Sequence, residues 1–307
     1  MIDSVLLIAF GGPTEPGEIR PFLDNVTRGR RIPPERLKEV ARHYRRIGGR
    51  SPLNELTRKQ ADGLRAVLEA DAIALPVFVG MRNWRPYLWE ALSEMTGKGH
   101  RRALGIILSS FQSEASWERY QQDVVEARGR VGSAAPEVLY APPWFDHPRF
   151  IEAVADRARA ALEALPAARR AATPLVFTAH SVPVSMAQGS PYVKQFTQAS
   201  GLVAERLGHG RWMLAYQSRS GSPAEPWLEP DIGEVISELA RDGAQEAVVV
   251  PIGFVVDHVE ILYDLDVEAQ ELAASAGVTF HRARAVNDHP AFVAMLADLV
   301  KRGLAGR

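Results

Sequence analysis

The 307-residue sequence contains no cysteine. Without cysteine, the chain cannot form disulfides, bind zinc through thiolates, hold an iron–sulfur cluster on cysteine ligands or use a thiol nucleophile. Metal ligands are therefore limited to other side chains, such as histidine and the carboxylates.

Long apolar runs and an excess of positive charge are also missing. No stretch approaches the roughly 18–20 apolar residues that cross a bilayer, and the first ten residues, with an acid at Asp3, resemble a strand rather than a signal peptide. The formal net charge is −1, so no basic field indicates nucleic acid. We expect a soluble cytoplasmic protein with no transmembrane segment and no nucleic-acid partner.

Short, continuously apolar runs alternate with longer segments of helical period. Such runs are typical of strands buried on both faces, and their alternation with helices predicts an α/β fold with parallel sheets flanked by helices. The predicted strands are Val5–Phe10, Pro76–Gly80, Leu104–Leu108, Val138–Tyr140, Leu175–Ala179, Trp212–Tyr216, Ala247–Ile252 and Val278–Phe280. The clearest predicted helices are Leu53–Glu69, Phe150–Leu165, Ile232–Ala240 and Ala291–Val300.

The order of these runs repeats in the second half of the chain. Three pairs of segments match in order: Leu6–Pro13 with Leu175–Pro183, Val77–Gly80 with Met213–Tyr216, and Gly105–Leu108 with Val248–Pro251. An Asp-His-Pro-x-Phe sequence then follows in each half, at 146–150 and 288–292, where we expect the histidines to be structural. We predict two similar domains, residues 1–165 and 166–307, with Leu165–Pro174 as the linker.

Carboxylates line up after the seventh predicted strand. A helix is predicted to begin near Asp257, a good N-cap residue, which places Glu260, Asp264 and Glu268 on one face. Like charges at this spacing destabilise a helix, yet residues 242–281 contain no Lys or Arg. Because oxygen ligands suit hydrated divalent cations, the stripe indicates a path for metal or protons. An exposed acidic helix is the alternative.

One histidine, His180, lies where a predicted buried strand gives way to a loop. In parallel α/β sheets, ligands bind beyond the carboxyl ends of the strands. Imidazole can bind a divalent metal or accept a proton near neutral pH. A single histidine is weak evidence, and a structural role is the alternative, but the acidic helix follows another strand end of the same predicted sheet.

Six segments carry distinctive combinations of residues. The two most specific read Phe-Thr-Ala-His-Ser-Val-Pro at 177–183 and Pro-Ile-Gly-Phe-Val-Val-Asp-His-Val-Glu at 251–260. The others are Phe10–Pro13, Ile47–Leu53, Tyr216–Gly221 and Trp227–Asp231. Together they closely resemble the signature segments of the ferrochelatases, enzymes that insert Fe²⁺ into a porphyrin in heme synthesis. The resemblance implies two Rossmann-like, chelatase-type domains with a porphyrin cleft between them.

The resemblance also implies site residues. The catalytic and metal-contacting pair of the family falls on His180 and Glu260, and its acidic continuation falls on Asp264 and Glu268. Porphyrin-binding positions fall on Ser51 and Tyr120, and the segments that would line the same cleft carry Phe10, Arg28, His43, Tyr44 and Trp227.

The chain departs from some members of the family. Certain bacterial members have an iron-coordinating tyrosine at position 10, whereas Phe10 cannot coordinate. In this respect, and in Val26–Arg30 and Asn83-Trp84, the chain resembles the actinobacterial-type branch. Some members of that branch bind a [2Fe–2S] cluster through cysteines. Here we expect no iron–sulfur cluster and no permanently bound cofactor, Fe²⁺ being a substrate, and we expect a monomer.

A basic cluster near the N-terminus suits the propionates of a porphyrin. It consists of Arg28, Arg30, Arg31, Arg45, Arg46 and Arg50, and a solvated basic surface is the alternative. Coproporphyrin III, the more carboxylated substrate, would gain more from these arginines than protoporphyrin IX. We therefore favour coproporphyrin III as the substrate.

Two other functions compete with iron insertion. A cobalt or nickel chelatase acting on another tetrapyrrole, such as sirohydrochlorin, would share the architecture. A non-catalytic tetrapyrrole or metal carrier would bind without turnover and would not need a stripe of carboxylates. A nucleotide-dependent enzyme is disfavoured, because Gly11-Gly12-Pro13 is not a G-x-G-x-x-G sequence and no P-loop is present.

Overall fold

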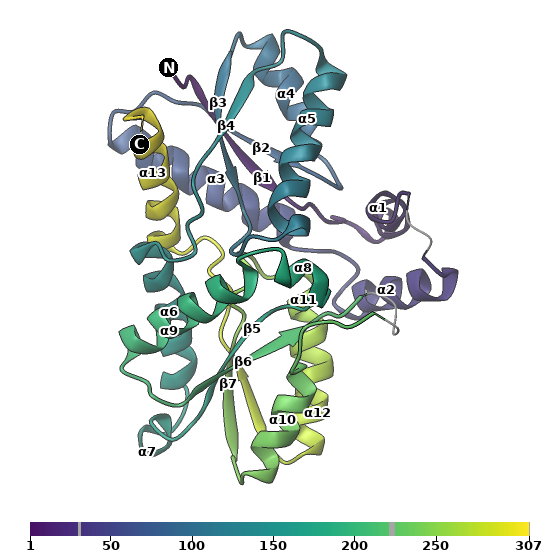
Figure 1. Cartoon of the computed structure of the whole chain (residues 1–307), viewed down its shortest axis with the longest axis vertical. Helices are drawn as coiled ribbons and strands as arrows, with labels where there is room; N and C mark the ends of the chain where they lie inside the picture. Colours follow the sequence, from purple (N-terminus) through teal and green to yellow (C-terminus); the bar gives the residue numbers. More distant parts are fainter. Residues whose placement is uncertain (30–31, 221–224, 307) are drawn as a thin grey trace. The chain divides into compact units, whose positions relative to one another are not determined.

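A computed structural model describes residues 1–29, 32–220 and 225–306 of the chain (Figure 1). Arg30, Arg31 and Gly221, which belong to segments singled out above, lie outside the described residues. The chain forms two compact units. The first unit comprises Met1–Ser109, Ala115–Pro142 and Val293–Arg307, and the second comprises Ser110–Glu114 and Pro143–Phe292.

The first unit is built on a four-stranded parallel sheet in the order β2-β1-β3-β4. All six residues of β1 are buried, because helices cover both faces of a parallel sheet. The strands are β1 (Ser4–Ala9), β2 (Val77–Met81), β3 (Arg102–Ile107) and β4 (Glu137–Tyr140).

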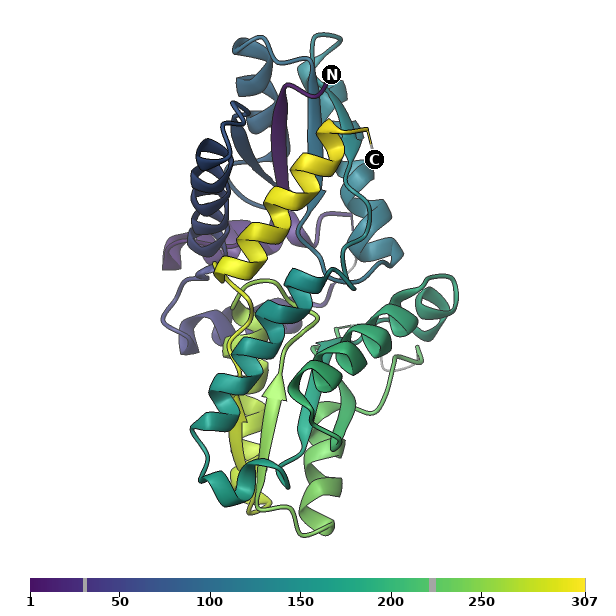
Figure 2. The same ribbon diagram turned by 90° about the vertical axis from the view of Figure 1, so that its left-hand side faces the viewer.

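Helices lie on both faces of this first sheet (Figures 1 and 2). On one face, α4 and α5 pack against each other. On the other face, Gly63 of α3 lies so close to Val293 of α13 that a Cβ on the glycine would be 3.0 Å from the valine Cγ2. An ion pair of 2.7 Å joins Lys301 to Asp71 at the end of α3. The helical segments are η1 (Pro16–Glu18), α1 (Ile19–Val26), α2 (Pro34–Arg46), α3 (Leu53–Ala70), α4 (Leu88–Gly97), η2 (Glu114–Glu118), α5 (Arg119–Val131) and α13 (Pro290–Leu304).

The second unit repeats this architecture with a parallel sheet in the order β6-β5-β7-β8. Helices α6 and α9 pack together on one face, and α10 and α12 pack together on the other (Figure 1). The strands are β5 (Leu175–His180), β6 (Trp212–Gln217), β7 (Glu246–Val250) and β8 (Thr279–Arg282). The helical segments are α6 (Pro148–Glu163), α7 (Ala167–Arg170), α8 (Val184–Gln188), α9 (Tyr192–Leu207), α10 (Ile232–Arg241), α11 (Val259–Leu262), the π-helix η3 (Asp264–Ala269) and α12 (Gln270–Ser275).

The two sheets confirm the predicted repeat. Their strand orders are equivalent when β1 to β4 are matched in sequence with β5 to β8. The two echoed histidines also have matching roles, since the Nδ1 of His147 accepts a hydrogen bond from Arg149 N and the Nδ1 of His289 accepts one from Ala291 N, both 3.2 Å. The fold class, all eight strands and the four helices predicted from the sequence are confirmed, with ends that shift by a few residues.

The division of the chain differs from the predicted ranges 1–165 and 166–307. Helix α6 follows a strand of the first unit but packs on β7 of the second, and Val293–Leu304 of α13 belongs to the first unit although β8 belongs to the second. The predicted linker Leu165–Pro174, which includes α7, lies within the second unit. An apolar helical face shows that a helix covers a sheet but does not specify which sheet.

In the described ranges, none of the helices combines the length and the hydropathy that a transmembrane span needs.

Candidate active site

His180 is the last residue of β5, at the carboxyl edge of the second sheet. Its backbone carbonyl accepts a 2.8 Å hydrogen bond from the hydroxyl of Tyr192, and burial raises the pKa of that hydroxyl well above its usual range. Tyr192 therefore stays protonated and remains a donor. On the neighbouring strand, Gln217 lies opposite His180, and its carbonyl accepts a 2.7 Å bond from Ser181 N.

The two ring nitrogens of His180 have different surroundings. Nδ1 is in hydrogen-bond contact with the carbonyl oxygen of Ser181, which can only accept. The proton of the neutral ring is therefore on Nδ1, which leaves the lone pair on Nε2. Nε2 faces Glu260, whose Oε1 is 3.8 Å away.

Glu260 lies at the start of the short helix α11, which follows the loop after β7. The Nδ1 of His258 caps this helix by accepting a 3.1 Å hydrogen bond from Glu260 N. The Gln217 side chain donates a 2.6 Å bond to the carbonyl oxygen of Glu260, whereas its Oε1 has no partner in the described part of the chain. Gln217 thus connects the backbone of Glu260 to the end of β6, the strand beside β5, and His258 fixes the first turn of α11.

The helix begins close to the predicted position, at Val259, but Asp257 is not its N-cap residue. The carboxylate of Asp257 points to the loop after β8, where it accepts bonds from Arg282 Nη1 at 2.9 Å and Asn287 Nδ2 at 2.7 Å. These partners occupy the oxygens that would otherwise cap the helix, so the capping role passes to His258. Burial lowers the pKa of His258, which keeps its Nδ1 unprotonated and able to accept.

The carboxylate stripe spans α11 and the π-helix η3 rather than one continuous α-helix. Asp264 begins η3, and its carboxylate accepts a hydrogen bond from the Ser218 hydroxyl. Exposure increases along the stripe, since Glu260 and Asp264 are half-buried and Glu268 is exposed. This gradient of exposure is compatible with the predicted path, which leads from Glu260 through Asp264 and Glu268 to solvent. In addition, π-helical turns occur frequently at functional sites.

A glycine fixes how closely the loop after β7 approaches β5. A Cβ on Gly253 would lie 2.6 Å from the Cα of Ala179, which is one residue before His180. Gly253 N also donates a 3.0 Å bond to Thr178 O. Any larger residue at position 253 would therefore push the loop and the end of β5 apart.

We expect Gly253→Ala to lower both stability and turnover, because the added methyl collides with backbone rather than with a movable side chain. The melting temperature should fall by several degrees, which corresponds to a cost of about 1–3 kcal/mol for overpacking. Gly210→Ala is a suitable control, since its Cβ would have no neighbour within 4 Å. Equal melting temperatures for the two variants would contradict this prediction.

Most of the predicted porphyrin-binding residues belong to the first unit, and three of them gather around Arg82 and Phe22. The guanidinium of Arg82 lies 4.2 Å from the ring centre of Tyr120 and 5.8 Å from that of Phe10. Phe22 is in edge contact with Phe10 at 6.4 Å and with Tyr44 at 5.9 Å. Phe10 is half-buried, whereas Tyr44 and Tyr120 are buried.

The other predicted porphyrin contacts are more dispersed. Ser51 is buried, and its hydroxyl accepts a 3.3 Å bond from Leu53 N. Arg28 is exposed and donates to Asn25 Oδ1 at 2.7 Å. His43 is half-buried, and burial lowers its pKa. In the second unit, Trp227 forms a backbone bridge with Pro183, and its indole nitrogen has no partner within the described ranges.

Sequence reasoning assigned no role to several residues that hold these groups in place. Arg82 directly follows β2, Gln217 ends β6 and Arg282 ends β8, whereas Tyr192 begins α9. Three of the four lie at the carboxyl ends of strands. Because ligands bind beyond these ends, this position could have identified them as candidates for the site. Tyr192 carried no comparable signal, because its hydroxyl reaches back to His180 from a helix.

The His180–Glu260 pair differs from a preassembled metal cage. Among residues 1–29, 32–220 and 225–306, no group of three or more histidine and carboxylate side chains forms a metal site. The separation of 3.8 Å between Nε2 and Oε1 is longer than a hydrogen bond. It is shorter than the sum of two metal–ligand bonds of about 2.1 Å each, so one cation could contact both atoms.

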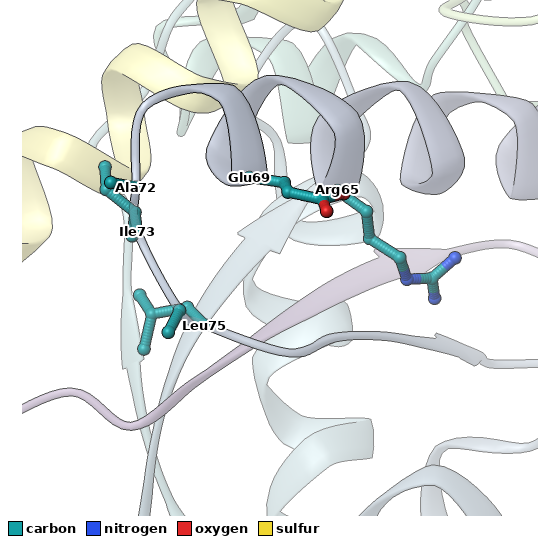
Figure 3. A pocket seen from close by; sticks show the side chains of 6 residues that line it. Arg65, Glu69, Ala72, Ile73 and Leu75 are labelled. Atoms are coloured by element: carbon teal, nitrogen blue, oxygen red, sulfur yellow. The ribbon is translucent and has the colours of Figure 1, made fainter.

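A surface hollow elsewhere in the first unit takes no part in this arrangement (Figure 3). It lies between the end of α3 and the start of β2 and is lined by Arg65, Glu69 and residues 72–75. These residues precede β2, at the opposite end of the strand from Arg82, and none of them is a predicted site residue.

Comparison with known proteins gives a consistent family. The family model described as Ferrochelatase matches residues 3–304. A ferrochelatase of Rhodopirellula baltica is 43% identical over 303 residues, covering 98% of this chain and 86% of that protein. The coproporphyrin III ferrochelatase of Mycolicibacterium smegmatis is 42% identical over 307 residues (99% and 90% covered). That of Nocardia farcinica is 44% identical over 313 residues (99% and 89% covered).

Solved structures agree on the fold. SirB from Bacillus subtilis with Fe³⁺ has a TM-score of 0.61 at 14% identity, covering 98% of this chain and 95% of that one. The sirohydrochlorin chelatase SirB in complex with cobalt has a TM-score of 0.59 at 12% identity, with the same coverage. This likeness supports the two-domain chelatase fold, whereas the full-length sequence similarity is to ferrochelatases. The chain therefore belongs to the ferrochelatase family, lyases that insert Fe²⁺ into a porphyrin in heme synthesis.

Proposed function

We propose that this ferrochelatase acts on coproporphyrin III and that His180 and Glu260 form its metal-insertion centre. The observation that carries the proposal is the pairing of Nε2 and Oε1 at 3.8 Å, with the other ring nitrogen held by the Ser181 carbonyl. In the neutral ring, a lone pair on Nε2 beside a carboxylate suits both proton acceptance and contact with a divalent cation.

Iron insertion requires two pyrrole protons to leave and water to be removed from Fe²⁺. In our proposal, His180 Nε2 accepts a pyrrole proton or guides the metal onto the ring, and Glu260 acts beside it. Binding energy that holds the porphyrin bent would expose its nitrogen lone pairs and favour the transition state. Asp264 and Glu268 would then carry protons or hydrated metal between Glu260 and solvent.

The choice of coproporphyrin III rests on two kinds of support. Relatives at 42% and 44% identity are named coproporphyrin III ferrochelatases. Within the described residues, Arg28, Arg45 and Arg50 are exposed in the first unit, where added substrate carboxylates could pair with them.

Coproporphyrin III should therefore have a kcat/KM about tenfold or more above that of protoporphyrin IX, since one additional charge-assisted contact contributes about that factor. Porphyrin absorbance during Fe²⁺ insertion measures kcat/KM for each of the two porphyrins. The double variant Arg45→Gln/Arg50→Gln should reduce the ratio of the two kcat/KM values. The control Arg206→Gln, on the surface of the second unit, should leave this ratio unchanged. Equal or reversed values of kcat/KM for the wild type would remove the preference.

The proposal also covers the cofactor content, the oligomeric state and the location of the protein. We propose that it holds no iron–sulfur cluster, because its 307 residues offer no cysteine ligand. A monomeric state, a cytoplasmic location and the absence of a nucleic-acid partner stay predictions. Iron analysis of the purified protein would test the absence of a cluster. Elution in size-exclusion chromatography would test the monomeric state.

A further inference from the structure

We propose that Arg282 is a positioning residue for the segment that carries Glu260 and Asp264, because it connects η3 to the carboxyl edge of the second sheet. Its guanidinium bridges a carboxylate before Glu260 and a carboxylate after it. The inference rests on the proposed role of Glu260 and adds a residue, remote in sequence, on which that role depends.

Arg282 ends β8 and uses its guanidinium as a fork. Nη1 donates to Asp257 Oδ1 at 2.9 Å, Nη2 donates to Asp266 Oδ2 at 2.8 Å, and Nε pairs with the other oxygen of Asp266. The side chains of Arg282 and Asp257 are 13% and 9% exposed, so water screens this pair little. Bidentate pairing of this kind fixes geometry as well as charge.

The two carboxylates flank the candidate metal-insertion residues in the chain. Asp257 precedes α11, and Asp266 lies in the π-helix η3. Glu260 and Asp264 lie between them, on the segment that the guanidinium holds at both ends. If the guanidinium were removed, two carboxylates would face each other without their shared counterion, and the segment would move to separate or solvate them.

Asp257 connects this segment to a fixed point in the sheet edge. Its Oδ2 accepts a 2.7 Å bond from Asn287 Nδ2, its Oδ1 accepts a 3.2 Å bond from Ala285 N, and its own N–H donates to Asn287 Oδ1 at 2.8 Å. The loop after β8 therefore holds Asp257 even without Arg282. Arg282 adds the connection from this point to η3, so its loss would chiefly free the C-terminal end of the segment.

Arg282 acts through its neighbours rather than on the substrate. Its donors are directed to Asp257, Asp266 and the carbonyl oxygen of Ala283. Its positive charge would oppose a metal ion, and pairing with two carboxylates offsets that charge. The expected effect of removing it is a loss of turnover with little change in porphyrin binding.

The test compares Arg282→Met and Arg282→Lys with Arg284→Met. Arg284 is two residues away, is 61% exposed and comes only within 3.8 Å of Asp257, which makes it a matched control. For Arg282→Met we expect kcat for Fe²⁺ insertion to fall about tenfold to hundredfold, as for a displaced catalytic group. The KM for porphyrin should stay within about twofold of the wild-type value. Lysine should restore part of kcat, because it keeps the charge but not the fork.

Asp266→Asn provides a second route if Arg282→Met does not fold, since it weakens only the η3 side of the bridge. It should give the same selective loss of kcat, to a smaller extent. The proposal is overturned if kcat is unchanged in the folded variants, if the loss appears in KM, or if Arg284→Met loses as much. A wild-type protein that inserts no iron would instead contradict the proposed function.

Discussion

Replacing His180 with alanine should reduce iron insertion by at least about a hundredfold, the range expected when a proton acceptor is removed from its site. Nε2 is the ring nitrogen that faces Glu260, and alanine offers neither a lone pair for the metal nor an acceptor for a pyrrole proton. The loss should be in kcat, measured by porphyrin absorbance with Fe²⁺ or Zn²⁺. Porphyrin binding, followed by fluorescence, should persist.

A matched histidine in the same unit controls for the loss of an imidazole. His209, whose Nε2 contacts the carbonyl oxygen of Thr173 at 2.9 Å, lies before β6, at the amino ends of the strands rather than at the carboxyl edge that carries His180. His209→Ala should keep wild-type turnover. If His180→Ala turned over within a few-fold of the wild type, His180 would have no part in the mechanism.

Glu260→Gln should be the most damaging change in the carboxylate stripe, also by about a hundredfold or more in kcat. The amide is nearly the same size but has no charge for a cation and cannot accept the proton. Because the backbone of Glu260 is held by His258 and Gln217, the substitution should leave the local structure in place. Steady-state rates at saturating porphyrin measure this effect.

Position along the stripe provides an internal comparison for Glu260. Glu268 is exposed, so Glu268→Gln should lower the rate much less and mainly at low metal concentration. Glu238→Gln, on the exposed face of α10, should have no effect. A larger loss for Glu268→Gln than for Glu260→Gln would rule out the proposed direction from the stripe to the centre.

The sheets could be predicted from the sequence because their strands are buried on both faces. Runs such as Val5–Phe10 and Leu175–Ala179 are apolar without alternation, and each half of the chain presents four of them in the same order. Parallel pairing then places all the strand carboxyl ends at one edge, which is why His180 and the segment carrying Glu260 could be expected near each other.

The detail around Glu260 could not be predicted, because it depends on residues far along the chain. Asp257 has the chemistry of an N-cap, but Arg282 and Asn287, 25 and 30 residues later, take its oxygens. Residues 242–281 contain no Lys or Arg, which gave no indication of a counterion for the carboxylates. The next residue, Arg282, is the arginine that pairs with Asp257 and Asp266. Local spacing also assumes an α-helix and cannot reveal the π-helix η3.

The exchange of α6 and α13 links the folding of the two halves of the chain. Each half encodes a complete four-stranded sheet, yet the helix that follows its fourth strand packs within the other unit. Almost fully buried apolar residues of α13, among them Leu296 and Val300, thus complete the core of the unit whose sheet begins with β1. α13 must therefore be synthesised before the first unit can be completed.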